Sequence, residues 1–206
     1  MIYLLLFTIT ATGFQSDKAI RIDGVLKKDE WKGAQEYQLG KGNKLLIQKS
    51  NDALYAAMVS ENGFWAHFYL SDGNIVKVMH ASAALDAVEY KKNNSLWLTQ
   101  DTFQYEMRDT VYNAETEAKM LKYFTKNGWI ANNVNLGSDK TIEFKVNISQ
   151  WKKPLYFACV MANFDMTFHP FPANLNDNTV LPRLVQGYTP DSLNFEPVKW
   201  EKIKAD

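Results

Sequence analysis

The stretch 140–148, KTIEFKVNI, alternates between apolar and polar side chains without a break. Successive side chains of an extended strand point to opposite faces, so this pattern sorts the stretch into two sides. The side that we expect to face a core carries Ile142, Phe144, Val146 and Ile148. The side that we expect to face solvent carries Thr141, Glu143, Lys145 and Asn147. Such alternation is typical of a strand in an antiparallel sheet with one buried face.

Short apolar or alternating runs of this kind recur along the chain and predict strands. They lie at residues 45–48, 54–59, 64–70, 75–79, 96–98 and 142–148. Turn-forming clusters such as Ser50-Asn51-Asp52 and Ser71-Asp72-Gly73-Asn74 separate them, which favours hairpins over βαβ units. The sequence therefore predicts an all-β antiparallel β-sandwich.

One helix interrupts the strand pattern, over residues 114–126. Asn113 precedes it as a candidate N-cap, and Glu115 and Glu117 lie in its first turn, where carboxylates interact favourably with the helix dipole. The pair Asn127-Gly128 supplies the residues that commonly end a helix.

The two ends of the chain differ in character from its middle. Residues 1–9 are almost wholly apolar and precede Ala11-Thr12-Gly13, which predicts a signal peptide over residues 1–15; a buried first strand is the alternative. We therefore expect one domain over residues 16–206, secreted or periplasmic and without a transmembrane span. An irregular arm rich in proline and aromatic residues occupies residues 163–190, and we expect it to lie across the sandwich.

The charge and motif content excludes several classes of function. Lys and Arg total 23 and Asp and Glu total 23, so no broad positive field favours nucleic acid. No phosphate-binding loop or nucleophile-elbow motif is present. The nearby carboxylates Asp86 with Glu89 and Glu106 with Asp109 are interpreted as solvated charge, and we expect no catalytic activity.

Metal and thiol chemistry receive little support from the sequence. His67, His80 and His169 lack the spacing of metal ligands. Cys159, which cannot form an internal disulfide, is expected to be a buried packing residue. A structural calcium ion held by residues 71–74 or 174–178 remains open.

The segment 22–34, IDGVLKKDEWKGA, resembles the opening signature of carbohydrate-binding module family 9-like domains, which belong to the DOMON-like β-sandwich superfamily. A second similarity joins GWIA at 128–131 to TIEFKVNI at 141–148, so the resemblance covers most of residues 19–148. We interpret Asp23-Gly24 as a turn and Trp31 and Ala34 as residues that bury against the sandwich edge.

The resemblance implies an extracellular immunoglobulin-like or DOMON-like sandwich that often binds sugars. Some members instead bind heme through Met and His, for which this chain would offer Met58, Met79, Met107 and Met161. Core filling is the simpler interpretation of these methionines. An envelope protein-interaction domain is a third hypothesis.

Sugar recognition requires flat aromatic faces together with amides and carboxylates. The leading hypothesis is therefore a non-catalytic module that binds a glycan or polysaccharide through four aromatic residues, Trp65, Tyr69, Trp97 and Trp129. The alternative is that the arm covers this face, with Trp65 and Tyr69 packed beneath Phe168 or Phe171. We expect Trp151 and Trp200 to cover strand edges.

Overall fold

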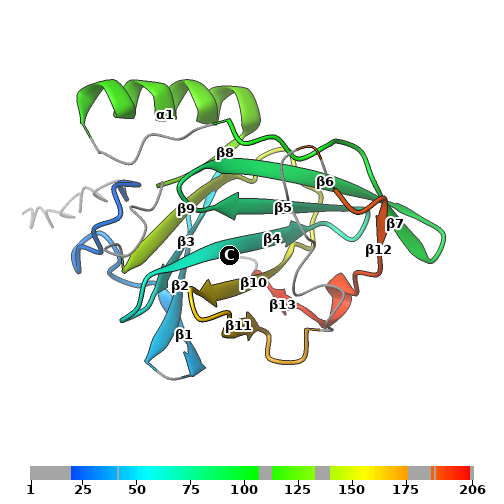
Figure 1. Ribbon diagram of the computed structural model, residues 1–206, viewed down its shortest axis with the longest axis horizontal. Helices are drawn as coiled ribbons and strands as arrows, with labels where there is room; N and C mark the ends of the chain where they lie inside the picture. The colour runs from blue at the N-terminus through cyan, green and yellow to red at the C-terminus, as the bar shows by residue number, and fades with distance from the viewer. Residues whose placement is uncertain are drawn as a thin grey trace, which may run out of the picture.

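The computed structural model describes residues 20–40, 42–106, 113–132, 140–175, 187 and 189–204, and the predicted signal peptide lies outside them. This part of the chain forms two antiparallel sheets and one α-helix (Figure 1). The elements in chain order are β1 Gln35–Gly40, β2 Asn43–Lys49, β3 Ala53–Val59, β4 Phe64–Ser71, β5 Ile75–Ala81, β6 Leu85–Asn93, β7 Leu96–Thr99, α1 Ala114–Asn127, β8 Trp129–Ala131, β9 Thr141–Asn147, β10 Tyr156–Asn163, β11 Phe168–Phe171, β12 Ser192–Leu193, the 3-10 helix η1 Pro197–Lys199 and β13 Glu201–Lys202.

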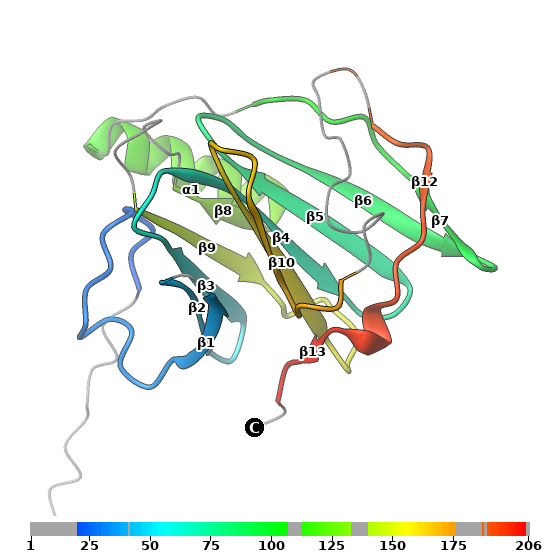
Figure 2. The same ribbon diagram turned by 60° about the horizontal axis from the view of Figure 1, so that its bottom comes forward.

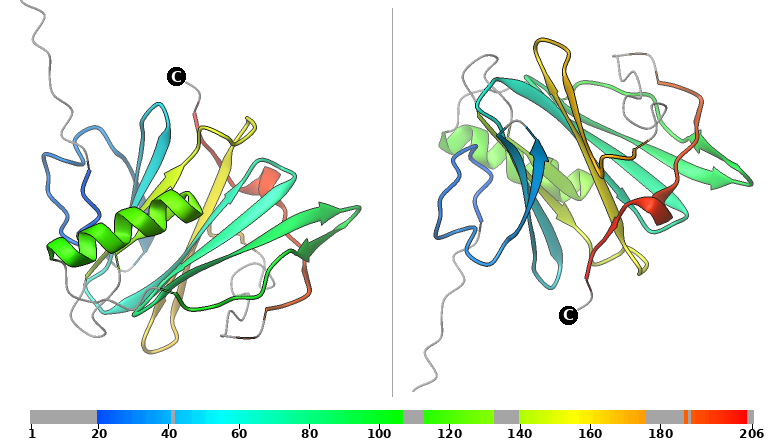
Figure 3. Two further views of the ribbon diagram at one scale, coloured as in Figure 1. Left: turned by 90° about the horizontal axis from the view of Figure 1, so that it is seen from above. Right: turned by 90° about the horizontal axis from the view of Figure 1, so that it is seen from below.

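The two sheets face one another in a sandwich-like arrangement, as the sequence predicted (Figure 3). The smaller sheet has the order β1-β2-β3-β9-β8. The larger, curled sheet has the order β11-β10-β4-β5-β6-β7-β12, with β13 also paired to β10. All pairings are antiparallel, and the chain passes between the sheets from β3 to β4 and from β9 to β10.

Large apolar side chains from both sheets fill the space between them. Phe68 lies 5.6 Å from Phe144 of the opposite sheet and 6.0 Å from Phe157, measured between ring centroids. Leu45, Leu54 and Met58 are also fully buried in this layer. Complete burial of one such side chain stabilises the fold by about 1.5–3 kcal/mol, so this inner layer is the main source of stability.

Helix α1 begins at Ala114 as the sequence predicted and ends at Asn127, one residue later than predicted. The Asn113 side chain accepts a hydrogen bond from Thr116 N at 2.9 Å, and Gly128 adopts the left-handed conformation at the C-terminal end. Met120 and Tyr123 are the helix residues buried against the core, with the Tyr123 ring 5.5 Å from that of Trp129. The helix thereby closes the side of the sandwich next to β8.

A segment that follows the predicted arm 163–190, residues 192–202, covers the outer face of the larger sheet. It runs from β12, which pairs with β7, to β13, which pairs with β10, and so crosses the sheet (Figure 2). Phe195 and Trp200 form a second apolar layer there with Tyr69 and Tyr90. The predicted arm itself is more regular than expected, because Phe168–Phe171 form β11 and pair with β10. Leu175 of the arm belongs to the outer apolar layer and Phe168 packs against it, while residues 176–186 and 188 lie outside the described part.

The prediction that the polar side chains of residues 140–148 face solvent is wrong for two of them. Thr141 and Glu143 are buried, because the segment that carries the signature motif packs over this face of β9. Glu143 accepts hydrogen bonds from the backbone nitrogens of Asp23 and Gly24 and from Trp31 Nε1. Trp31 is buried and Ala34 is half-buried, in agreement with the prediction that these two residues pack against the sandwich.

Candidate functional site

The structure does not bring the four predicted sugar-binding aromatics together on an open surface. Tyr69, Trp97 and Trp129 expose 0%, 2% and 1% of their surface. Trp65 is half-buried, and its ring lies 6.0 Å from that of Phe164. Three of the four residues therefore have no face available to a ligand in this conformation.

Each buried aromatic has a specific packing partner. Trp97 donates its indole N–H to the Phe195 carbonyl at 2.8 Å, and Tyr69 packs against Phe195 and Trp200. Trp129 lies in the inner layer, 6.4 Å from Phe144. Tyr69 is covered, as the alternative predicted, but the covering residues Phe195 and Trp200 lie beyond the arm 163–190. Phe171, one of the two residues predicted to cover it, packs against the inner layer instead.

A cleft of about 610 Å³ opens at one end of the sandwich, between the two sheets and beside the end of α1. We call it the Trp151 cleft. Its size lies within the range of small-molecule sites. Its walls come from β5, β6, the end of α1, the end of β9 and the connection that follows β9; the lining residues are Asp72, Ile75, Lys77, Glu89, Thr125, Lys126, Asn127, Gly128, Val146, Asn147, Gln150 and Trp151.

Polar groups are fixed in the wall of this cleft. Lys77 Nζ donates to Glu89 Oε1 at 3.1 Å and to the Asn127 carbonyl at 3.2 Å, so the ammonium group joins β6 to the end of α1. The Asn127 Nδ2 atom is buried and has no hydrogen-bond partner within the described structure. A buried donor without a partner costs about 1–3 kcal/mol.

Trp151 is held at the cleft by the β9–β10 connection, residues 148–155. Its backbone nitrogen donates to the Ile148 carbonyl at 3.2 Å. Asn147 N donates to Gly128 O, and Ile148 N donates to Asp52 O, each at 2.8 Å. These bonds tie the connection to α1 on one side and to the β2–β3 turn on the other. The backbone of Trp151 is therefore fixed, and its half-buried indole packs against the inner apolar layer.

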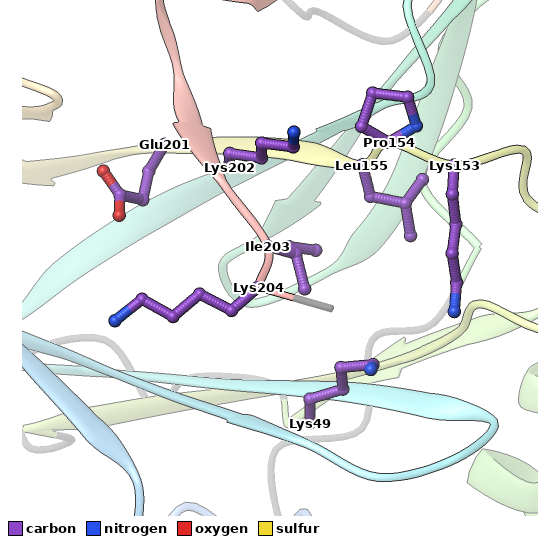
Figure 4. Close-up of a pocket in the computed structure, with 8 residues that line it drawn as sticks. All are labelled: Lys49, Lys153, Pro154, Leu155, Glu201, Lys202, Ile203 and Lys204. Atoms are coloured by element: carbon purple, nitrogen blue, oxygen red, sulfur yellow. The ribbon is translucent and has the colours of Figure 1, made fainter. Parts of the chain in front are cut away.

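A second cleft, of about 800 Å³, lies on the other side of the same connection, and we call it the lysine cleft (Figure 4). Pro154, Leu155 and Ile203 supply its apolar groups. Its charged residues are Lys49, Lys153, Lys202, Lys204 and Glu201. Ile203 N donates to the Leu155 carbonyl at 2.9 Å, which fixes the C-terminal strand against the start of β10. Both clefts thus share the β9–β10 connection as a common wall.

A buried histidine pair lies on the outer face of the larger sheet. His67 and His80 are register partners on β4 and β5, with ring centroids 4.9 Å apart. Burial lowers the pKa of His67 to about 4, and burial followed by the proximity of His67 lowers the pKa of His80. Both imidazoles are therefore neutral near pH 7. His169 faces a different region, with its Nε2 atom 3.3 Å from Asn163 Nδ2.

Metal and heme ligands are not gathered in the described part of the chain. No group of three or more His, Cys, Asp or Glu residues there is placed to hold a metal ion. Met58, Met79 and Met161 lie fully buried in the inner layer, and Met107 lies outside the described residues.

The candidate calcium turn has a structural role. Asp72 Oδ1 accepts hydrogen bonds from Asn74 N and Ile75 N within the β4–β5 turn. Of the other candidate, residues 174–178, only Asn174 and Leu175 belong to the described part. One oxygen of the Asp72 carboxylate is therefore used to stabilise the turn. The structure adds no support for the calcium hypothesis.

The carboxylates Asp86 and Glu89 point to opposite faces of the larger sheet and do not converge. Asp86 is the register partner of His80, whereas Glu89 is the partner of Lys77. Asp109 lies outside the described residues. Burial raises the pKa of Asp86 to about 6, while hydrogen bonds from Gln104 and Ala87 lower it.

Sequence analysis missed the Trp151 cleft because Trp151 was interpreted as an edge cover. The available signal was local: an indole with Asn147 and Gln150 close by, directly after a strand end. The partners from α1, β5 and β6 are distant in sequence and could not be placed beside it without the fold.

Comparison with known proteins adds no further assignment. No protein-family model, no curated protein and no solved structure matches the chain. No helix among the described residues has the length and apolar character needed to cross a bilayer.

Proposed function

We propose that this protein is a non-catalytic carbohydrate-binding module that binds a glycan in the Trp151 cleft. The observation that carries the proposal is the half-buried indole of Trp151 in the wall of a cleft that amides, carboxylates and ammonium groups also line, together with the apolar Ile75 and Val146. A sugar ring presents C–H groups on its faces and hydroxyls at its edge. An aromatic face beside convergent hydrogen-bonding groups matches both.

The polar residues of the cleft provide both donors and acceptors for hydroxyl groups. Gln150 is exposed and its amide can both donate and accept, and Glu89 keeps one carboxylate oxygen outside its bond to Lys77. Opposite charges are balanced here, since Asp72 and Glu89 accompany Lys77 and Lys126. This balance suits an uncharged polyol portion of a ligand.

The fold is consistent with the same proposal. A sandwich-like antiparallel architecture, with the 22–34 motif anchored on β9 through Glu143, supports placing the chain among DOMON-like, family 9-like binding modules. The proposed setting is secreted or periplasmic, where polysaccharides are encountered. Fold alone does not establish function, so the argument depends on the cleft.

Affinity electrophoresis through gels that contain neutral or acidic plant, algal and bacterial polysaccharides tests the proposal. We expect retardation by at least one polysaccharide. Trp151→Ala should weaken that binding by at least about tenfold, because central aromatic contacts dominate interfaces. Trp151→Phe should retain part of the binding. Glu89→Gln should weaken it by about 3- to 10-fold through one lost or altered hydrogen bond.

The matched control is Phe164→Ala, which removes an aromatic ring that is 47% exposed and lies outside the cleft. We expect this variant to bind like the wild type. Circular dichroism of each variant separates loss of binding from loss of folding. Absence of retardation by every polysaccharide, or wild-type binding by a folded Trp151→Ala variant, would contradict the proposal.

A further inference from the structure

The lysine cleft concentrates positive charge in a protein whose total formal charge is balanced. Four lysines stand there against one glutamate, and Lys152 lies exposed on the shared connection. The chain as a whole carries 23 basic and 23 acidic residues. The excess is therefore a local feature of this end of the sandwich, and the composition of the chain does not reveal it.

The charges of this cleft are not neutralised by its own glutamate. Glu201 accepts a hydrogen bond from the Tyr37 hydroxyl at 3.3 Å. In Figure 4 its carboxylate points to the side opposite from the ammonium ends of Lys49 and Lys153. Within the described residues, no carboxylate forms an ion pair with Lys153, Lys202 or Lys204. Anions from solution or from a ligand can therefore approach these ammonium groups.

The lysine cleft and the Trp151 cleft lie close enough to serve one ligand. Trp151 and Lys153 are two residues apart, which limits their Cα separation to about 7 Å. Figure 3 shows the β9–β10 connection at the same end of the molecule as the end of α1 and the C-terminal segment. A chain-like ligand seated on Trp151 can thus continue across the connection into the lysine cleft.

We infer that the glycan bound by this protein is acidic, with carboxylate groups that the lysine cleft recognises. This inference rests on the proposed function and names the class of its ligand. Pro154 and Ile203 would contact the apolar faces of uronic acid rings, while the lysines pair with their carboxylates. The Trp151 cleft, with its balanced charge, binds the part of the chain between carboxylates.

Lysine contributes a point charge on a flexible stem, so each exposed pair adds only about 0.2–1 kcal/mol. Three such pairs together change affinity by about tenfold or somewhat more. These contacts are also screened by salt. An acidic ligand should therefore show both a charge preference and a dependence on ionic strength, and a neutral ligand should show neither.

The test compares polygalacturonate oligomers with the same oligomers after reduction of their carboxyl groups, by calorimetric titration at low and high NaCl. The variants are K153Q/K202Q/K204Q and a control, K28Q/K32Q/K122Q, which removes equal charge from exposed lysines elsewhere. We expect wild type and control to prefer the acidic oligomer about tenfold at low salt. We expect the cleft variant to lose this preference and to bind the reduced oligomer as wild type does.

The outcomes separate the inference from the proposed function. Equal binding of acidic and reduced oligomers by the wild type overturns the inference and leaves glycan binding intact. The same holds if the cleft variant keeps the full acidic preference. A further outcome is that the wild type fails to bind these oligomers and yet is retarded by a neutral polysaccharide in the gel assay. That result also overturns the inference and leaves the proposed function intact. Absence of binding to every glycan in both assays overturns the two together.

Discussion

Trp31 donates its indole N–H to the Glu143 carboxylate at 3.1 Å, across 112 positions of the chain. The same carboxylate accepts the backbone N–H groups of Asp23 and Gly24 at 3.1 and 2.9 Å. One buried side chain of β9 therefore holds both the turn and the tryptophan of the N-terminal motif. The motif is rigid because three of its donors converge on a single acceptor group.

The first prediction concerns the Glu143 carboxyl and pH. Burial raises its pKa to about 7, although the hydrogen bonds from Gly24 and Trp31 lower it. The native state thus binds the proton more tightly than the unfolded state, so the stability that this carboxyl contributes is lost as pH rises from about 4.5 to about 7. Glu143→Gln removes this dependence. We expect the wild type to have a larger free energy of unfolding than the variant at both pH values. This difference between the two proteins should be larger at pH 5 than at pH 8, by up to about 3 kcal/mol.

Urea unfolding at the two pH values measures this difference. The control is Glu61→Gln, which alters an exposed carboxylate and should show the same small effect at both pH values. At pH 8 the Glu143→Gln variant also lacks one acceptor oxygen and should still lose about 1–3 kcal/mol for an unpaired buried donor. If the free energies of unfolding of wild type and Glu143→Gln differ by the same amount at pH 5 and at pH 8, the role assigned to this carboxyl is wrong.

The second prediction compares two glycines of the N-terminal motif. Gly24 has a φ of +75°, and an added Cβ would lie 2.8 Å from Asn132 Nδ2. That amide donates to the Thr141 carbonyl, while Asn132 Oδ1 accepts from Glu143 N, so it cannot move freely. Gly33 has a φ of +92° and no atom within 4 Å of an added Cβ.

Gly24→Ala should therefore destabilise the protein more than Gly33→Ala. Both variants incur the backbone cost of about 1 kcal/mol for a left-handed alanine. Only the first adds a steric conflict, which we expect to cost a further 1–3 kcal/mol or so. Thermal unfolding of the two variants side by side gives the comparison. Equal loss in both would contradict the close approach of Gly24 to Asn132.

The third prediction concerns the buried imidazoles. Burial lowers the pKa of His67 to about 4, so the unfolded state binds more protons between about pH 6.5 and pH 4. Stability is therefore lost as pH falls through this range. Its neighbours on this face are His80, the register partner of Asp86, and Tyr69. His67→Leu removes one titrating group and a buried Nδ1 atom that has no hydrogen-bond partner in the described structure.

We expect His67→Leu to be more resistant than wild type to urea at pH 5 and to differ from it by less than about 1 kcal/mol at pH 8. Measurement at both pH values is essential, because a packing defect would act equally at each. A variant less stable than wild type at pH 5 would show that the imidazole ring contributes contacts that outweigh its titration.

The fourth prediction concerns the thiol. Cys159 is fully buried in β10, and burial raises its pKa, so the reactive thiolate is disfavoured. We expect negligible reaction with a thiol-specific disulfide reagent in the native state and rapid stoichiometric reaction in concentrated urea. Fast labelling of native protein would show that β10 opens or that the thiol is exposed.

Strand positions were predictable wherever one periodic signal dominated. The alternation at 140–148 and the caps of residues 113–128 lead directly to β9 and α1. Strand β6 was not predicted, because Asp86, Glu89 and Lys91 interrupt its apolar residues. Those charges are accommodated by partners on neighbouring strands, such as Lys77 for Glu89. Strand β1, with mostly exposed residues, likewise lacks an apolar run.

The sequence by itself determined the antiparallel β class of the fold and the elements with a strong local signal, such as β9 and α1, since periodicity and capping are properties of neighbouring residues. Only the tertiary structure decided which aromatics meet solvent. Packing of the C-terminal segment buried Tyr69 and Trp97, while the short β9–β10 connection left Trp151 at a cleft. Burial depends on which distant segments cover a face, and no local pattern of the chain encodes that.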